Sequence, residues 1–331
     1  AEAGSTVAVY ANGVELGKAT ETSTAGTFTY KSSTLVDGNY SVYATSTDTA
    51  GNVTESTAQD IIIDTVDPDL PTISSASLSN SATPTLTGTA EVGSTVTVVV
   101  TGSSTGATYT TTATDGNWSI DTSSTADLDS GTLALNTNGS NTVSVTSTDA
   151  AGNVSAAASQ TLTLDTTDAT VSASTDKADG SYTVGEEIDI TLTFDESVTL
   201  SGSAGLNITL QDGSSTTVAT LNVTAAELNG VSTVTKTYTV AAGDTAGDLT
   251  VSGVALGTSA TLQDDAGNDA DLSSLTATVG TSDAIVIDTT APATPTVASI
   301  TTPDDDATPT ITITAEAGST VAVYANGVEL G

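Results

Sequence analysis

The residues of this chain that could do chemistry are carboxylates and side-chain amides in a recurring five-residue motif. The motif D-x-A-G-N occurs at residues 48–52, 149–153 and 264–268. Each copy offers an aspartate carboxylate, a glycine that permits a tight turn and an asparagine amide oxygen. Calcium is a hard cation that takes about six to eight oxygen ligands of these kinds. The motif therefore predicts calcium binding.

Further carboxylates recur at fixed places around the motif. Each copy is followed by a segment that ends in Asp-Thr, and two of these segments continue as I-D-T-x-x-P, at residues 63–68 and 287–292. An acidic residue precedes Gly-Ser-Thr-Val at Glu91, and an acidic pair stands at Asp195 and Glu196. The candidate metal ligands are Asp48, Asn52, Asp64, Asp67, Glu91, Asp149, Asn153, Asp165, Asp168, Glu196, Asp264, Asn268 and Asp288.

A second interpretation of the motif needs no metal, because Asp and Asn side chains also form hydrogen bonds within turns. The charge of the chain favours calcium over this alternative. The chain has 40 acidic and 4 basic residues, a formal net charge of −36. Carboxylates at this density repel one another unless bound cations neutralise them.

Composition excludes several classes of function. The chain contains no Cys, Met or His, so it lacks thiolate nucleophiles, imidazole bases and the ligands that most transition metals prefer. A nucleophilic serine would have no histidine partner. We therefore expect no enzymatic activity. The acidic surface repels phosphate backbones, which argues against nucleic-acid binding.

The elements that must position the candidate ligands are predicted to be β-strands. Val and Ile alternate with Ser and Thr in short segments such as 95–100, 141–147 and 188–194, and Gly-, Asn- and Asp-rich turns separate them. Alternation with period two is typical of strands with one buried face. About seven such strands make an immunoglobulin-like sandwich of roughly 100 residues. We predict an all-β fold with almost no helix.

Internal repetition sets the predicted domain organisation. The first 17 residues, AEAGSTVAVYANGVELG, recur unchanged as residues 315–331. We interpret a sequence that restarts on itself as one period of an array. Residues 1–65 are then the C-terminal part of one domain, 66–166 a complete domain and 167–290 a larger complete domain. Residues 291–331 are the N-terminal part of a domain of the first type.

Trp118 is the only tryptophan in the chain. A sandwich commonly buries one large aromatic residue, so we predict that Trp118 lies in the core of residues 66–166. The alternative is that its indole stacks on a sugar ring.

The combination of AE-x-GSTV, D-x-A-G-N and I-D-T-x-x-P resembles the bacterial Ig-like repeats in the stalks of giant secreted adhesins, including the RTX and biofilm-associated types. The resemblance covers essentially the whole chain. It implies tandem immunoglobulin-like β-sandwich domains arranged end to end in an extracellular fibre on the bacterial cell surface. It also implies calcium at the junctions between domains, where the ion limits hinge motion.

The resemblance implies a set of ligands at each boundary. The first boundary would use Asp48, Asn52, Asp64 and Asp67, and the second Asp149, Asn153, Asp165 and Asp168. The third would use Asp264, Asn268 and Asp288. The second boundary departs from the pattern, because it has no proline where Pro68 and Pro292 stand in the others.

These observations predict a structural extender, a calcium-stiffened stalk of a surface adhesin that mediates cell adhesion or biofilm formation. Its expected partners are neighbouring repeats or copies of itself, with a host or biofilm ligand bound through other regions, and no membrane insertion. A rival hypothesis is a self-assembling filament or surface-layer subunit, in which residues 291–314 of one chain complete the sandwich begun by residues 1–65 of another. A third is a glycan-binding module.

Overall fold

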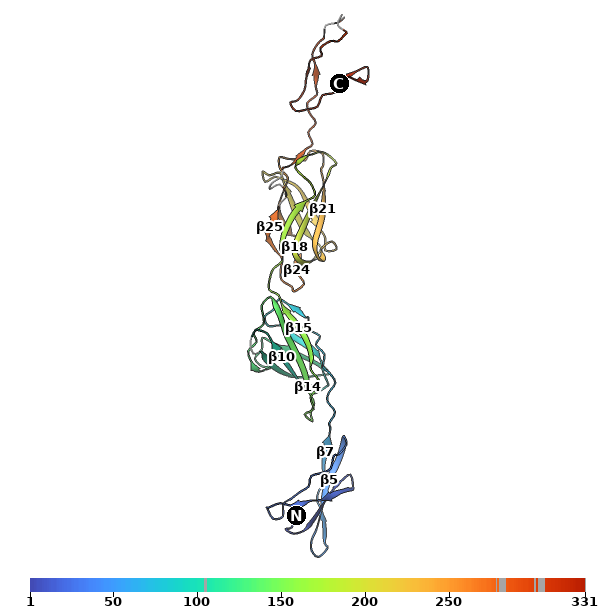
Figure 1. Ribbon diagram of the computed structural model, residues 1–331, viewed down its shortest axis with the longest axis vertical. Coiled ribbons are helices and arrows are strands. Elements are labelled where there is room, and N and C mark those ends of the chain that lie inside the picture. The colour runs from blue at the N-terminus through green and yellow to red at the C-terminus, as the bar shows by residue number, and fades with distance from the viewer. Residues whose placement is uncertain (104–105, 278, 280–283, 301, 303–306, 331) are drawn as a thin grey trace. The chain divides into compact units, whose positions relative to one another are not determined.

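The computed structural model of the chain describes residues 1–103, 106–277, 279, 284–300, 302 and 307–330 (Figure 1). Every regular element among these residues is a β-strand, so the predicted all-β fold is confirmed. The same part of the chain has no helix long and apolar enough to cross a bilayer. The chain divides into two compact units, Ala1–Thr167 and Asp168–Gly331.

Residues 1–65 contain one five-stranded sheet and one short hairpin. The strands are β1 (Thr6–Ala11), β2 (Val14–Lys18), β3 (Thr20–Glu21), β4 (Phe28–Thr29), β5 (Gly38–Thr47), β6 (Val53–Glu55) and β7 (Gln59–Ile63). In the sheet, β5 pairs with β1, β6 and β7, and β2 pairs with β1; β3 and β4 form the hairpin. The longest strand, β5, thus organises the whole sheet.

One face of this sheet has no covering layer within residues 1–65. The only hydrophobic residues that are buried in this segment are Val7 and Ala11. Ile61 on β7 is 39 % exposed, whereas Leu162, which precedes the matching Asp-Thr segment by the same spacing in residues 66–166, is 1 % exposed. A second layer of strands is needed to bury this face.

Residues 66–166 form a two-layered sandwich. The strands are β8 (Leu78–Ser79), β9 (Thr85–Thr89), β10 (Thr95–Thr101), β11 (Ala107–Thr112), β12 (Asn117–Asp121), β13 (Leu128–Gly131), β14 (Gly139–Thr148) and β15 (Ala158–Leu164). One sheet has the order β13-β11-β10-β14-β15-β8, and the other consists of β9 and β12. Alternate residues of β10 point inward, so Val96, Val98 and Val100 are at most 1 % exposed.

Trp118 fills this core and constrains the strand opposite to it. Its side chain is 2 % exposed, and its Nε1 donates a hydrogen bond to the Thr72 carbonyl oxygen at 3.2 Å. The prediction that Trp118 is a core residue is confirmed. Trp118 pairs with Gly88 across β12 and β9. A Cβ at Gly88 would lie 1.9 Å from the Thr72 carbonyl oxygen and 2.7 Å from the indole, so only glycine fits here.

Residues 168–290 form a larger sandwich. The strands are β16 (Thr170–Thr175), β17 (Gly180–Tyr182), β18 (Glu187–Ser201), β19 (Leu206–Gln211), β20 (Thr217–Val223), β21 (Asn229–Thr239), β22 (Thr245–Ala246), β23 (Thr250–Leu256), β24 (Thr261–Asp264), β25 (Asp271–Ala277) and β26 (Ile285–Asp288). One sheet has the order β21-β18-β16-β25, with β24 also on β18; the others are β17-β26-β22 and β20-β19-β23. A continuous core runs from Ala169 to Ile287.

The last described residues carry two isolated hairpins. They are formed by β27 (Thr296–Val297) with β28 (Ile313–Thr314), and by β29 (Tyr324–Ala325) with β30 (Val328–Glu329). Among residues 291–300, 302 and 307–330, no hydrophobic side chain is buried.

The two identical 17-residue segments adopt different structures. In the first copy, Thr6–Ala11 pairs along its whole length with β5. In the second copy the paired residues that the structure describes are confined to the β29–β30 hairpin. Val7 is 7 % exposed, but its counterpart Val321 is 37 % exposed. Pairing with a distant strand, and not local propensity, decides whether this sequence forms a long strand.

The local turn is the same in both copies. Asn12 and Gly13 have φ of 48° and 80°, and Asn326 and Gly327 have φ of 52° and 80°. Two successive left-handed residues are characteristic of the type I′ hairpin turn, for which Asn-Gly is the preferred sequence.

The substitution Gly88→Ala should destabilise the sandwich of residues 66–166 by about 2–3 kcal/mol, because the new methyl group overpacks the core against backbone. The only tryptophan, Trp118, reports on this domain in fluorescence-monitored urea unfolding. Gly139→Ala is the control in the same domain, since a Cβ at Gly139 makes only ordinary van der Waals contact, at 3.4 Å from the Asn136 Cβ. A loss below about 0.5 kcal/mol for Gly88→Ala, the range of neutral surface changes, would contradict the packing described.

Candidate junction and metal site

The D-x-A-G-N motif forms a closed turn, which is most complete at residues 149–153. Oδ1 of Asp149 accepts the backbone N–H groups of Ala151, Gly152 and Asn153 at 2.8, 2.7 and 2.9 Å. Its Oδ2 accepts Nδ2–H of Asn153 at 2.7 Å. Gly152 supplies the left-handed backbone with φ of 99°. The carboxylate therefore organises the whole turn.

The other two copies repeat this arrangement. Nδ2 of Asn52 donates to Oδ2 of Asp48 at 2.7 Å, and Nδ2 of Asn268 donates to Oδ2 of Asp264 at 2.8 Å. The hydrogen bonds of the metal-free interpretation are thus present in all three turns. Oδ2 of Asp149 accepts one of these hydrogen bonds, and a carboxylate oxygen has more than one acceptor position, so the turn leaves room for a further ligand contact at Oδ2.

The turn favours the ionised form of its aspartate. The hydrogen bond from the Asn153 side chain lowers the pKa of Asp149 below its ordinary value of 3.8. The Asn52 side chain lowers the pKa of Asp48 in the same way. Both carboxylates are therefore charged at neutral pH and available to a cation.

The strand register corrects the predicted grouping of ligands at the second boundary. In the antiparallel pair β14–β15, Gly139 is opposite Leu164 and Val145 is opposite Ala158. Asp149 follows the far end of β14, whereas the end of β15 lies beside Gly139. With about 3.4 Å per residue, the ends are roughly 30 Å apart. The turn residues Asp149 and Asn153 cannot share an ion with Asp165 and Asp168 of the same domain.

The same error affects the other two boundaries. In residues 1–65, Gly38 at the start of β5 pairs with Ile63 at the end of β7, which separates Asp48 and Asn52 from Asp64 and Asp67. In residues 168–290, Asp264 pairs with Val198 late in β18. Asp288 is the last residue of β26, which pairs with β22. The strand β22 follows β21, and the last residue of β21 pairs with the first residue of β18. Asp264 and Asn268 are thus separated from Asp288.

In residues 66–166 the turn instead lies at the end where the chain enters the domain. Nδ2 of Asn153 donates a hydrogen bond to the Asp64 carbonyl oxygen at 3.2 Å. This turn therefore meets the Asp-Thr segment that precedes its domain, not the one that follows it.

The Asp-Thr segments form a recurrent turn of their own. Oδ1 of Asp64, Asp165 and Asp288 accepts the backbone N–H two residues later at 3.1, 3.1 and 2.9 Å. This is an Asx turn, which fixes the direction in which the chain leaves each domain.

In the first two Asp-Thr segments the threonine is held by a residue that the sequence analysis did not predict. Oδ1 of Asp37 accepts the backbone N–H and the hydroxyl of Thr65 at 3.1 and 2.9 Å. Oδ1 of Asn138 accepts the same groups of Thr166 at 2.7 and 3.0 Å. The available signal was an Asp-Gly or Asn-Gly pair at the start of the longest strand in each of the first two domains.

A matching clamp holds the start of the next domain. Asp195 accepts the backbone N–H of Thr170 through Oδ1 and its hydroxyl through Oδ2, both at 2.7 Å. These bonds, the hydroxyl bond first, lower the pKa of Asp195. The carbonyl oxygen of Ala169 accepts the N–H of Asp271 at 2.8 Å, and Ala169 is fully buried.

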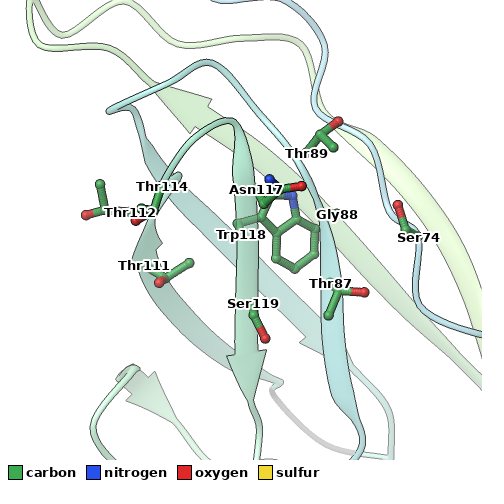
Figure 2. A pocket seen from close by; sticks show the side chains of 10 residues that line it. All are labelled: Ser74, Thr87, Gly88, Thr89, Thr111, Thr112, Thr114, Asn117, Trp118 and Ser119. Atoms are coloured by element: carbon green, nitrogen blue, oxygen red, sulfur yellow. The ribbon is translucent and has the colours of Figure 1, made fainter.

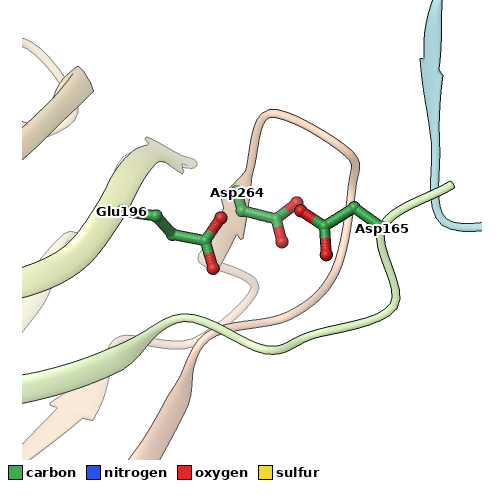
Figure 3. Close-up of side chains that lie close together, drawn as sticks. All are labelled: Asp165, Glu196 and Asp264. Atoms are coloured by element: carbon green, nitrogen blue, oxygen red, sulfur yellow. The ribbon is translucent and has the colours of Figure 1, made fainter. Parts of the chain in front are cut away.

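Two carboxylates of the second unit lie beside this clamp. An oxygen of Glu196 on β18 lies within 4.8 Å of an oxygen of Asp264 at the end of β24 (Figure 3). Asp264 is 6 % exposed. Two carboxylates at this separation repel each other unless a proton or cation lies between them.

Asp165, also drawn in Figure 3, belongs to the first unit. It stands four residues before the anchored Ala169. Four residues span at most about 14 Å. The covalent chain therefore keeps Asp165 close to the end of the second unit that carries Glu196 and Asp264.

The remaining predicted ligands are more dispersed. Glu91 is exposed and lines a shallow depression together with Asp69. The residues Asp67, Asp168 and Asp288 are exposed as well.

A hydroxyl-rich groove of about 580 Å³ lies over the β9–β12 pair (Figure 2). Thr87, Thr111 and Asn117 are among its lining residues, and the Trp118 indole lies beneath them. Because Trp118 is only 2 % exposed, the ring has no free face for stacking on a sugar. The groove thus offers a glycan hydroxyl groups and the Asn117 amide, but no aromatic face.

Few carboxylates are neutralised within the chain. Among the described residues there are two ion pairs, Lys177 with Asp176 at 3.1 Å and Lys236 with Glu227 at 2.8 Å. The hydrogen bond from Lys236 lowers the pKa of Glu227 to about 2.

Comparison with known proteins identifies the fold. The sequence profile of the bacterial Ig-like domain matches residues 1–65 and 72–166. No curated protein matches the chain significantly. The predicted all-β fold of tandem immunoglobulin-like domains is confirmed.

Two solved structures are similar to the chain at low identity. One is of a 1.5-MDa bacterial ice-binding adhesin, with 21 % identity, a TM-score of 0.34 and coverage of 86 % of this chain and 87 % of that chain. The other is of fibronectin(III)-like modules of Clostridium thermocellum CbhA, with 16 % identity, a TM-score of 0.32 and coverage of 50 % and 80 %. Both TM-scores lie below 0.5, so neither similarity specifies a function.

The turn at residues 149–153 predicts an acid-sensitive stability. Because the pKa of Asp149 is depressed in the folded state, its contribution to stability is present above the unfolded pKa and is lost as the pH falls through the folded pKa. Asp149→Asn should lower the stability at pH 7 and flatten its decline as the pH falls below the ordinary aspartate pKa of 3.8. Urea unfolding followed by Trp118 fluorescence measures both.

The control for this prediction is Asp129→Asn, which removes the same charge from an exposed position in the same domain. An unchanged pH profile for Asp149→Asn, or an equal change for Asp129→Asn, would show that the turn carboxylate does not stabilise the fold.

Proposed function

We propose that this chain, in which residues 1–65 and 72–166 are bacterial Ig-like repeats, is part of the stalk of a bacterial surface adhesin. Its role is structural: it holds sandwich domains in series outside the cell and keeps an adhesive region at a distance from the cell surface. Stalks of this kind serve cell adhesion or biofilm formation.

The observation that carries the proposal is the clamped junction between the second and third domains. Thr166 is fixed to its own domain by Asn138, and Thr170 is fixed to the next domain by Asp195. With Ala169 buried, only Thr167 and Asp168 lie between the two anchors. A linker this short leaves few conformations to the chain, which suits an extender and not a flexible tether.

The preceding junction is longer but is restrained by different means. Thr65 is held by Asp37, and the N–H of Thr72 donates to the Thr89 carbonyl oxygen at 2.8 Å. Between these anchors, Pro68 and Pro71 restrict the backbone. Both prolines are buried.

We further propose that calcium completes the second junction. Glu196 and Asp264 supply two facing carboxylates, the tether keeps Asp165 near them, and the chain has a net charge of −36. Carboxylates and backbone carbonyls are the oxygen donors that Ca²⁺ prefers. An ion held by residues of both domains would oppose hinge motion, because bending would break metal–oxygen contacts.

The residues fit this cation better than its alternatives. The chain has no His or Cys, which zinc sites generally require. Glu196 is half-buried and Asp264 is buried, so removal of their mutual repulsion by a divalent ion stabilises the folded form.

Glu196→Gln should weaken calcium binding about tenfold or more, because it removes one charged oxygen ligand without disturbing the 264–268 turn. Isothermal titration calorimetry measures the affinity of the chain. Small-angle scattering should show a greater maximum dimension in calcium than in chelator for the unmodified chain, and a smaller difference for the variant.

Glu187→Gln is the matched control, since Glu187 is exposed at the opposite end of the same strand. It should leave both measurements unchanged. Identical scattering profiles with calcium and with chelator, together with no calcium-dependent heat, would refute the calcium proposal. The stalk proposal would then depend on the clamped linkers alone.

A further inference from the structure

Two tyrosine rings lie stacked on the sheet of residues 1–65. Tyr10 on β1 is directly opposite Tyr43 on β5 in the antiparallel pair. Their ring centroids are 5.0 Å apart, and the ring planes are inclined by 5°. This is the one stacked aromatic pair within the described residues. Directly opposite side chains stay close for as long as their strands remain paired, so the sheet itself holds the two rings together.

The pair lies on the face of the sheet that points to solvent. Val7 on β1 is buried, and Tyr10 stands an odd number of residues later, so its side chain projects from the other face. In residues 66–166 the segment GSTVTVV at 93–99 corresponds to GSTVAVY at 4–10. The counterparts of the two tyrosines are Val99 and Ser144, which also oppose each other.

This face stays open in a complete sandwich. Val99 is 37 % exposed although both layers of its domain are present. The accessibility of the tyrosine pair is therefore independent of the layer that would cover the other face of the sheet. Tyr10 and Tyr43 are both half-buried, so small diffusible reagents reach them.

The composition of the chain directs oxidants to its tyrosines. The chain has no Cys or Met, the side chains that oxidants commonly modify, and it has no His. Its single tryptophan, Trp118, is 2 % exposed. Of the eight tyrosines, Tyr109 and Tyr238 are 1 % and 4 % exposed. One-electron oxidation therefore falls on the accessible tyrosines, and Tyr10 and Tyr43 already lie ring against ring.

The stacked geometry suits coupling between the rings. A tyrosine that loses one electron and its phenolic proton becomes a phenoxyl radical, whose unpaired electron occupies π orbitals on the oxygen and on the neighbouring Cε atoms. These orbitals project perpendicular to the ring plane, so nearly parallel stacked rings direct them at each other. Two such radicals join through one Cε atom of each ring. Each new tetrahedral Cε then loses its proton while its oxygen gains one, which restores both aromatic rings.

A carboxylate is placed to take a proton from the pair. Glu15 on β2 is directly opposite Tyr10, and its Oε2 accepts a hydrogen bond from the Tyr10 hydroxyl at 3.5 Å. When Tyr10 loses an electron, its phenol gives up the proton along this hydrogen bond, and Glu15 passes it to solvent. Three neighbouring strands thus provide one ring, its coupling partner and a base.

We propose that Tyr10 and Tyr43 form an oxidative modification site, at which hydrogen peroxide and a haem peroxidase couple the two rings to dityrosine. Each ring gives up one electron and one proton, and the peroxide is reduced to two molecules of water. The new carbon–carbon bond joins β1 to β5 beside their hydrogen bonds. It constrains the unfolded chain as a disulfide would, in a protein that has no cysteine. This modification goes beyond the proposed structural role and does not depend on calcium.

Limited oxidation of the unmodified chain tests the site. The chain is treated in chelator with a peroxidase and a small amount of hydrogen peroxide, and the monomer band is digested with trypsin. The lysines stand at positions 18, 31, 177 and 236, so Tyr10 is the one tyrosine of peptide 1–18 and Tyr43 lies in peptide 32–177. Mass spectrometry should find these two peptides joined with the loss of two hydrogen atoms, together with dityrosine fluorescence.

Phenylalanine variants identify the coupled rings. Tyr10→Phe and Tyr43→Phe keep a ring of nearly the same size in the stack but cannot form a phenoxyl radical, so each should lose the joined peptides. Tyr40→Phe is the matched control, because Tyr40 lies on the same strand and in the same peptide but projects from the other face of the sheet. It should keep the yield. The unmodified chain unfolded in urea should lose the joined peptides, since β1 and β5 no longer pair.

Hydrogen exchange measures what the bond does for the sheet. The amides of Thr6–Ala11 should exchange more slowly in the linked chain than before oxidation, and Tyr43→Phe treated in the same way should show no change. No joined peptides from the native chain, an equal yield in urea, or their persistence in Tyr43→Phe would overturn the proposal. A linked chain whose β1 amides exchange as before would show that the bond does not secure the sheet.

Discussion

Backbone pairing between strands that lie far apart in the sequence is the interaction on which the rest of this structure depends. The identical segments at residues 1–17 and 315–331 keep the same Asn-Gly turn, but only the first makes a six-residue strand, because only there does β5 supply a partner. The sheet of residues 1–65, which has no second layer within these residues, keeps its hydrogen bonds and leaves its apolar face open.

The same pairing dictates what the ends of each domain can do. The antiparallel pairs β14–β15 and β5–β7 place the D-x-A-G-N turn and the Asp-Thr segment at opposite ends of each of the first two domains. The junction between these two domains is built from the Asp-Thr segment of the first and the D-x-A-G-N turn of the second. Hydrogen bonds from Thr166 to Asn138 and from Thr170 to Asp195 then leave few residues between these two anchored threonines.

Much of the fold was predictable because it follows from local patterns. Alternation with period two identified the strands, the Gly-containing motifs identified the turns, and the isolated Trp118 identified a core. The candidate site was harder to predict. Which carboxylates meet is a matter of register, which the spacing of Asp149 and Asp165 does not reveal. The clamp residues Asp37 and Asn138 act through partners 28 residues away in the sequence, and no local pattern joins them.

We propose that calcium holds the two sandwiches on either side of Thr167 and Asp168 in one orientation. Residual dipolar couplings of an isotope-labelled chain test it most directly, since each sandwich reports its own alignment tensor. We expect residues 72–166 and 169–288 to share one tensor in calcium and to acquire distinct tensors in chelator. Distinct tensors of unequal magnitude in saturating calcium would contradict it.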